Sequence, residues 1–213
     1  MGSTRYAADR RDTIAGVTTI EVPDPSLVLL VGAAGAGKTT FAARHFAPDE
    51  VLSSDAYRAL VSGDEANQTV SRVAFSILHR DHERRLRAGH LTVVDATNVE
   101  PRNRRELIRR AHAAGLPVVA LVLDLLPAIV LARNAARPRQ VDEAVIRSQL
   151  ERVRTTAADG VLAGEGCAIV WIGRTPEAID GVLIRRVPAA GSADPVDLAT
   201  PPALSPTQPP RPR

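Results

Sequence analysis

The chain has 213 residues, of which 45% are hydrophobic and 24% charged, and its formal net charge is only +3. This length and composition suit one globular domain with a buried core. Aromatic residues make up 3% of the chain, which excludes a nucleic-acid surface built mainly from stacked rings. The sole cysteine, Cys167, excludes an intrachain disulfide. No signal-peptide core or membrane-length apolar run is present, so we expect a soluble, cytoplasmic protein without a membrane partner.

Arginine accounts for nearly all of the positive charge, since Lys38 is the only lysine among 27 basic residues. Such an excess is typical of a high-GC codon bias. It is also compatible with phosphate recognition, because guanidinium groups bind phosphate through paired hydrogen bonds. The places where the arginines cluster must decide between the two.

Apolar runs and helical periodicities alternate along residues 18–187, which we take as the folded domain. Residues 1–17 are polar and predict a loose arm, and the Pro-rich residues 188–213 predict a disordered tail. Strands are predicted at 27–31, 51–53, 91–95, 118–123 and 167–172, and helices at 38–45, 70–88, 101–114, from 127 toward 133–139, at 142–156 and from 176. This alternation predicts an α/β fold whose five-stranded, mostly parallel sheet is flanked by helices. Cys167 opens the last apolar run, so we expect a buried, inert thiol.

The first apolar run leads into Gly-Ala-Ala-Gly-Ala-Gly-Lys-Thr, which fits the G-x-x-x-x-G-K-[ST] phosphate loop in full. Glycines let backbone N–H groups wrap a phosphate, and the helix that follows presents its positive end to the same anion. We therefore predict a three-layer P-loop NTPase that binds a nucleoside triphosphate. Its nucleotide-binding residues are expected to be Gly32, Gly35, Ala36, Gly37, Lys38, Thr39 and Thr40.

A carboxylate and an arginine follow the second predicted strand, in Ser-Ser-Asp55-Ala-Tyr-Arg58. Ligands of open parallel sheets bind beyond the carboxyl ends of the strands, which puts Asp55 near the mouth of the loop. There it can accept a proton from an attacking hydroxyl, with Arg58 touching an acceptor phosphate or the transferring group. The spacing is equally compatible with an N-cap Asp55 in an intrahelical ion pair with Arg58.

A second carboxylate, Asp95, ends the apolar strand Leu-Thr-Val-Val-Asp, the pattern of a Walker-B strand. We expect Asp95 and Thr39 to hold Mg²⁺, although a simple turn-forming aspartate has the same position. Thr97 and Asn98 follow and are predicted to line the acceptor groove.

Three arginines, Arg133, Arg137 and Arg139, share one Pro-interrupted segment between two predicted helices. Close cations repel one another until an anion arrives, so a lid that brings guanidinium charge to a triphosphate explains them. A solvated basic helix end is the alternative. The pair His79-x-x-His82 lacks convincing metal-ligand spacing and predicts a helix surface.

Together these motifs resemble the 5′-kinase module of bacterial polynucleotide kinase-phosphatases, over residues 18–182. The matching stretches are the phosphate loop, Ser-Ser-Asp-x-x-Arg, Asp64-Glu65 with Asn67-Gln68, Asp-Ala-Thr-Asn at 95–98, and the arginine segment 133–141. The resemblance implies ATP and Mg²⁺ as requirements and a 5′-hydroxyl end of DNA or RNA as acceptor. It also implies that Asp55 is the general base, that Arg58 contacts phosphate and the transition state, and that Arg133 and Arg139 engage the donor phosphates.

Two other functions compete with this one. A P-loop small-molecule kinase acting on an antibiotic, sugar or nucleotide-sugar hydroxyl would share the loop, the base and the lid and differ only in its acceptor pocket. A non-enzymatic nucleotide switch would need neither base nor lid, and the guanine-specific N-K-x-D motif is excluded because Lys38 is the only lysine.

Overall fold

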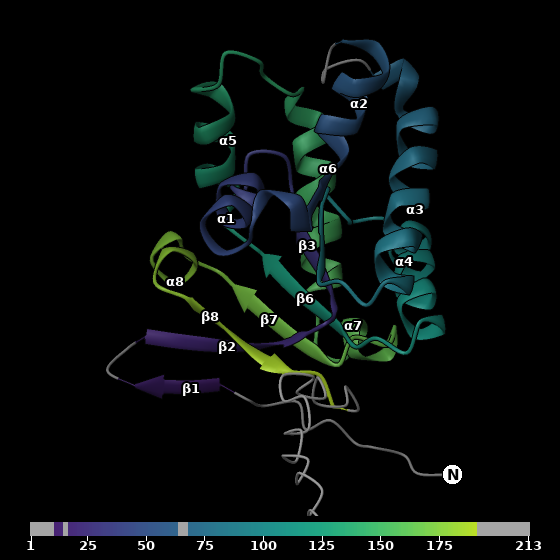
Figure 1. Ribbon diagram of the computed structural model, residues 1–213. Helices are drawn as coiled ribbons and strands as arrows, with labels where there is room; N and C mark the ends of the chain where they lie inside the picture. Colours follow the sequence, from purple (N-terminus) through teal and green to yellow (C-terminus); the bar gives the residue numbers. More distant parts are fainter. Residues whose placement is uncertain (1–10, 15–16, 64–67, 191–213) are drawn as a thin grey trace, which may run out of the picture.

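The computed structural model describes residues 11–14, 17–63 and 68–190 (Figure 1). At its centre lies a five-stranded sheet in which every neighbouring pair of strands is parallel. Its order is β4 (Val51–Ser53), β5 (Thr92–Asp95), β3 (Leu27–Gly32), β6 (Val118–Leu123) and β7 (Ile169–Gly173). The chain therefore changes direction across the sheet beside β3, the place where open α/β sheets bind their ligands. The predicted α/β class and the five-stranded parallel sheet are confirmed.

Helices cover both faces of this sheet and make it the middle of three layers (Figure 1). Successive residues of β3 point to opposite faces: Val28 and Leu30 pack with one core cluster, and Leu27 and Leu29 with the other. The helices are α1 (Lys38–His45), α2 (Ser54–Ser62), α3 (Ser71–Arg87), α4 (Pro101–Ala113), α5 (Pro127–Ala135), α6 (Glu143–Thr156), α7 (Val161–Gly164) and α8 (Pro176–Asp180), with 3₁₀ turns at Pro48–Glu50 and Gln68–Val70. Buried apolar residues of α1, α5 and α8 belong to the first cluster, and those of α4 and α7, with Leu86 of α3, belong to the second; α6 contributes to both.

A second, three-stranded sheet is a departure from the predicted elements. It consists of β1 (Arg11–Ile14), β2 (Val17–Asp24) and β8 (Leu183–Pro188), in the order β1-β2-β8. The expectation that residues 1–17 form a loose arm is therefore wrong for 11–14 and for the start of β2. Residues 1–10, 15–16 and 191–213, the rest of the predicted arm and nearly all of the predicted tail, lie outside the described residues, as do Asp64, Glu65 and Asn67 of the resemblance.

The structure also decides the predictions for two side chains outside the cleft. Cys167 is a free, buried thiol, as expected, and burial raises its pKa to about 12. The prediction that His79 and His82 lie on a helix surface is wrong for His82, which is fully buried in α3. Burial lowers the pKa of His82 to about 4. His82 lies at four-residue spacing from the buried Leu78 and Leu86, so it belongs to the core stripe of α3.

Every helix within residues 11–14, 17–63 and 68–190 is too short or too polar to cross a bilayer.

Candidate active site

The phosphate loop joins the end of β3 to the start of α1 and lines a cleft of about 990 Å³ at the carboxyl ends of the strands. Gly35 and Gly37 have φ angles of 85° and 98°, a conformation that residues with a Cβ rarely adopt. A Cβ at Gly37 would also lie 3.4 Å from Nη1 of Arg133. These two glycines let the loop turn its amides inward while an arginine approaches it closely.

Residues 34–40 of the loop and of the first turn of α1 line the cleft, and this set includes most of the predicted nucleotide-binding residues: Gly35, Ala36, Gly37, Lys38, Thr39 and Thr40. Gly32 is an exception. It does not line the cleft, and its N–H donates to the carbonyl of Thr97 at 3.1 Å. We assign Gly32 to shaping the loop, since its amide is already occupied.

Lys38 lies beneath the loop, buried, and its Nζ donates to the carbonyl oxygens of Gly32 and Ala33, each at 2.9 Å. The pKa of Lys38 is lowered to about 8, mainly by burial and in smaller part by the charge of Arg137, while the charges of Asp95 and Asp55 act in the opposite direction. The ammonium group is therefore held in place by two carbonyl oxygens of the loop that the sequence predicts to bind phosphate.

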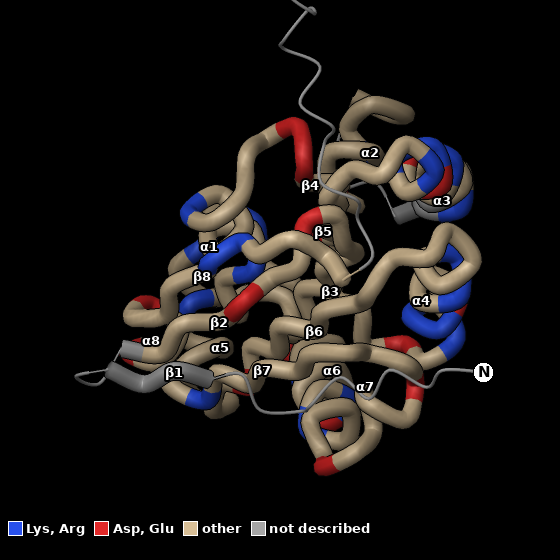
Figure 2. Tube along the Cα trace, turned by 60° about the horizontal axis from the view of Figure 1, so that its bottom comes forward, with Lys and Arg blue, Asp and Glu red and all other residues tan. Residues whose placement is uncertain are grey.

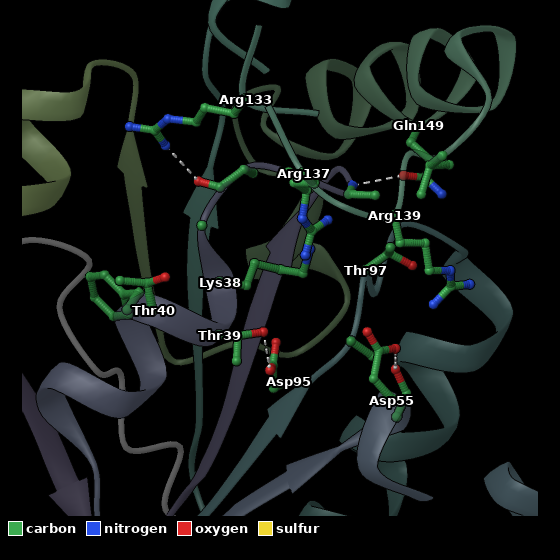
Figure 3. Close-up of a pocket in the computed structure, with 18 of the residues that line it drawn as sticks. Lys38, Thr39, Thr40, Asp55, Asp95, Thr97, Arg133, Arg137, Arg139 and Gln149 are labelled. Carbon is green, nitrogen blue, oxygen red and sulfur yellow. Dashed lines mark hydrogen bonds between the residues drawn. The ribbon is translucent and has the colours of Figure 1, made fainter. Parts of the chain in front are cut away.

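The pair predicted to hold a metal ion, Thr39 and Asp95, is brought together at the end of β5. The Thr39 hydroxyl donates to Oδ2 of Asp95 at 2.7 Å (Figure 3). Burial raises the pKa of Asp95, and the Thr39 hydrogen bond and the charge of Lys38 oppose that shift. Two neighbouring oxygens beside a phosphate loop fit Mg²⁺, which usually takes only one or two protein ligands and completes its shell with water and substrate phosphates.

Asp55 and Arg58 lie on α2 and line the same cleft. The N-cap of α2 is Ser53, whose side chain accepts from the backbone N–H of Ala56, so the N-cap role considered for Asp55 is wrong. The intrahelical ion pair does form, between Nη2 of Arg58 and Oδ1 of Asp55. Arg58 is nearly buried, with 9% of its side chain exposed, whereas 51% of the Asp55 side chain is exposed. A fixed arginine thus orients a carboxylate that remains open to the cleft.

The three predicted lid arginines all line the cleft but are spread along it (Figure 3). Arg133, in the last turn of α5, donates to the carbonyl of Ala36 in the phosphate loop at 3.3 Å. The positive charge of Arg137 lowers the pKa of Lys38. In Figure 3, Arg139 lies on the side of Asp55 and Thr97, and Arg133 lies on the opposite side of the view. This position favours a role of Arg139 beside Asp55 over the implied role on the donor phosphates.

The base of the arginine segment is fixed by Asn134, which sequence reasoning did not single out. Its side-chain Nδ2 donates to the carbonyl of Val141, and its Oδ1 accepts from the Val141 N–H, both at 2.9 Å. Asn134 therefore closes residues 135–140 into a loop that projects over the cleft. No sequence signal distinguishes this asparagine from a surface residue of α5.

Other side chains at the rim divide into cleft and scaffold residues. Gln149 on α6 accepts from the Ala34 N–H of the phosphate loop at 2.8 Å (Figure 3), a contact that no motif announces. Thr97 lines the cleft as predicted. Asn98 does not: it is buried and donates to the carbonyls of Leu30 and Val94, so it supports the strands.

Comparison with known proteins bears on this geometry. Residues 27–156, which carry the loop, both carboxylates and the arginine segment, match the model of the AAA_33 family, described as an AAA domain. The chain belongs to the AAA_33 family. No curated protein matches this chain closely enough to be counted as a relative.

Solved structures share the P-loop kinase fold with this AAA_33 chain. One, from a Pnkp1/Rnl/Hen1 RNA repair complex, is 19% identical with a TM-score of 0.54, and the match covers 63% of this chain and 46% of that one. Another, from the PezAT toxin–antitoxin system of Streptococcus pneumoniae, is 14% identical with a TM-score of 0.50, over 73% and 70% of the two chains. A shikimate kinase from Acinetobacter baumannii is 21% identical with a TM-score of 0.47, over 73% and 88%. The chain thus spans about half the length of the RNA-repair protein that it matches.

Proposed function

We propose that this protein transfers the γ-phosphoryl group of ATP to the 5′-hydroxyl end of a polynucleotide. The observation that carries the proposal is the arrangement around Asp55. An exposed carboxylate faces the phosphate-loop cleft, and two arginines, Arg58 and Arg139, line the cleft on its side. General-base catalysis accounts for the Asp55 carboxylate but not for the arginines. Two guanidinium groups beside that carboxylate favour an acceptor that carries negative charge of its own.

The size of the cleft agrees with two substrates. Its volume of about 990 Å³ lies at the upper end of the range of roughly 300–1,000 Å³ typical of ligand pockets. The phosphate loop and Arg133 occupy one end, so the γ-phosphoryl group of a bound nucleotide would point toward Asp55 at the other. An acceptor whose reactive hydroxyl lies next to a phosphodiester would then have its phosphate near Arg58 and Arg139.

The proposed reaction is an in-line displacement. The oxygen of the acceptor hydroxyl forms a bond to the γ-phosphorus as the bond from that phosphorus to the β–γ bridging oxygen breaks, and ADP leaves with the electron pair. The hydroxyl proton passes to the Asp55 carboxylate. Lys38, Arg133 and Arg137 offset the negative charge on the phosphates. Thr39 and Asp95 would hold Mg²⁺, which supplies further charge neutralisation when bound.

Transfer of labelled γ-phosphate tests the proposal directly. The acceptors are a 5′-hydroxyl oligonucleotide, a nucleoside 3′-monophosphate, the nucleoside without phosphate, and a panel of sugars and aminoglycosides. We expect label on the oligonucleotide and the 3′-monophosphate and much less on the bare nucleoside. Label on a sugar or antibiotic, with the nucleic-acid acceptors at background, would instead establish a small-molecule kinase. Asp55→Asn is the background control.

A further inference from the structure

Positive charge is concentrated on two adjacent helices outside the cleft. The segments α3 and α4 contain ten arginines and three carboxylates, a formal charge of +7, whereas the whole chain carries +3. The remainder of the chain is therefore net negative. Figure 2 shows the basic residues gathered over α3 and α4 at one side of the molecule. A codon bias raises the arginine content everywhere, so it does not explain this concentration.

A groove of about 490 Å³ runs between these two helices. It is lined from α3 by Arg72, Ser76, His79, Arg80 and Glu83, and from α4 by Asn103 and Arg110. All of these except Glu83 have hydrogen-bond donors in their side chains, and Glu83 is engaged in ion pairs with Arg87 and Arg110. Arg72, Ser76, Arg80 and Asn103 are exposed. Such a surface suits a ligand that presents a row of anionic acceptors.

The charges of the groove are only partly neutralised by the protein itself. Glu83 and Glu106 together form ion pairs with three arginines, Arg87, Arg109 and Arg110. Within the described ranges, neither Arg72 nor Arg80 has an ion pair. Arg110 is held in place by both glutamates and by the carbonyl of His79. One fixed and two unpaired guanidinium groups therefore face the groove.

A short, fixed segment joins this groove to the acceptor end of the cleft. Thr97 lines the cleft and Asn103 lines the groove. Between them, Asn98 is tied to the strands, and its carbonyl accepts from the buried Arg104 at 2.7 Å. Six residues span at most about 20 Å, which corresponds to about six stacked nucleotides at 3.4 Å each.

We propose that the α3–α4 groove binds the phosphates of a single-stranded acceptor polynucleotide whose 5′ end lies at Asp55. This inference rests on the proposed function and extends it, because it predicts that the acceptor is long. Short acceptors fill only the cleft, whereas strands of more than about six nucleotides also reach Arg72 and Arg80. With few aromatic residues available, the grip is electrostatic and independent of base sequence.

The test compares Arg72→Ser/Arg80→Ser with the wild type and with a charge-matched control, Arg174→Ser/Arg185→Ser, whose residues lie outside both linings. Binding of a fluorescent 12-nucleotide strand is followed by anisotropy over a range of salt concentrations, and KM is measured for acceptors of 2, 4 and 12 nucleotides. The groove variant should bind the 12-mer roughly tenfold more weakly. For this variant, the slope of the logarithm of the association constant against the logarithm of the salt concentration should be shallower by about 1.4, the value for two lost phosphate contacts to a single strand. KM for the 2-mer and kcat should stay as in the wild type.

Two results would overturn the inference: wild-type affinity and salt slope in the groove variant, which would leave the groove to a protein partner, or an equal loss in the control, which would indicate bulk charge alone. The binding measurement separates this inference from the function on which it rests. If the wild type binds the 12-mer through the groove but no strand of any length is phosphorylated, the groove is confirmed and the polynucleotide kinase proposal fails.

Discussion

The two ends of the cleft, the proposed donor end at the phosphate loop and the proposed acceptor end at Asp55, are built in different ways. At the donor end, consecutive residues of one loop and one helix form the phosphate site, and hydrogen bonds within it hold Lys38 and Thr39. At the acceptor end, α2, the segment after β5 and the loop after α5 each contribute a side chain: Asp55, Thr97 and Arg139. A contiguous site can be encoded by a motif. A site assembled from three distant segments depends on the fold, so it can diverge in substrate while the donor end stays the same.

The largest expected effect is at the donor end, where Thr39 and Asp95 share a hydrogen bond. Removal of divalent cations with a chelator should abolish phosphoryl transfer, and Asp95→Asn should lower kcat by roughly 10²–10³-fold because the buried carboxylate charge is lost. Titration of Mg²⁺ against activity measures both effects. Full activity of the chelated enzyme would remove the metal from the donor site.

The two ends can be separated through their arginines. Arg133→Ala should raise the KM for ATP by about 10–100-fold and leave the KM for the acceptor almost unchanged, since Arg133 contacts the phosphate loop. Arg139→Ala should do the reverse. Steady-state kinetics with each substrate varied in turn provides the check, with Arg174→Ala as a control outside the cleft. Identical patterns in the two cleft variants would mean that the division into ends is wrong.

Nucleotide binding should depend on pH through Lys38, whose pKa of about 8 lies below the ordinary value of 10.5. Below pH 8 the ammonium form is present and the affinity for ATP is constant. Above pH 8 binding must be accompanied by uptake of a proton, so the affinity falls by about tenfold per pH unit. Calorimetric titrations between pH 7 and 9.5 measure this slope. Lys38→Arg, which keeps its charge, should show a flat profile, and a flat wild-type profile would contradict the role of Lys38.

The smallest effect is expected at Gln149, which joins α6 to the phosphate loop through the Ala34 amide. Gln149→Leu leaves that amide without its partner, a loss of about 0.5–1.5 kcal/mol, so the affinity for ATP should fall by roughly two- to tenfold. Fluorescent-nucleotide displacement can resolve this difference. Gln149→Glu retains an acceptor oxygen and should keep the loop contact. If Gln149→Leu weakens binding of the acceptor as well as of ATP, the effect is not confined to the donor end.

Sequence predicted the elements whose signals are local. The helix at 38–45 and the strand at 118–123 have the predicted bounds, because glycine, proline and apolar runs mark their ends. The three-stranded sheet was missed because β2 pairs with β8 from 164 positions away, as in Glu21 and Arg185, and no local pattern reports such a pairing. The helix-surface prediction for His82 is wrong, although the four-residue spacing of His82 from Leu78 and Leu86 is the local signal of a buried stripe.

The candidate site shows the same division. The residue types of the phosphate loop specify their own geometry, so Lys38 and Thr39 could be assigned from sequence alone. The direction taken by the loop after α5 depends on the two hydrogen bonds between Asn134 and Val141, and this direction sends Arg139 to the acceptor end. Sequence can predict that three arginines face the cleft, but not how they are spread along it.

The central claim is that Asp55 acts on the acceptor and not on the nucleotide, and Asp55→Asn tests it most directly. Nucleotide affinity and single-turnover transfer to a 5′-hydroxyl oligonucleotide are measured on the same preparation. We expect ATP to bind within about twofold of the wild type, while transfer falls by at least roughly 10²-fold because the proton acceptor is lost. Wild-type transfer, or a loss of ATP affinity as large as the loss of transfer, would contradict the claim.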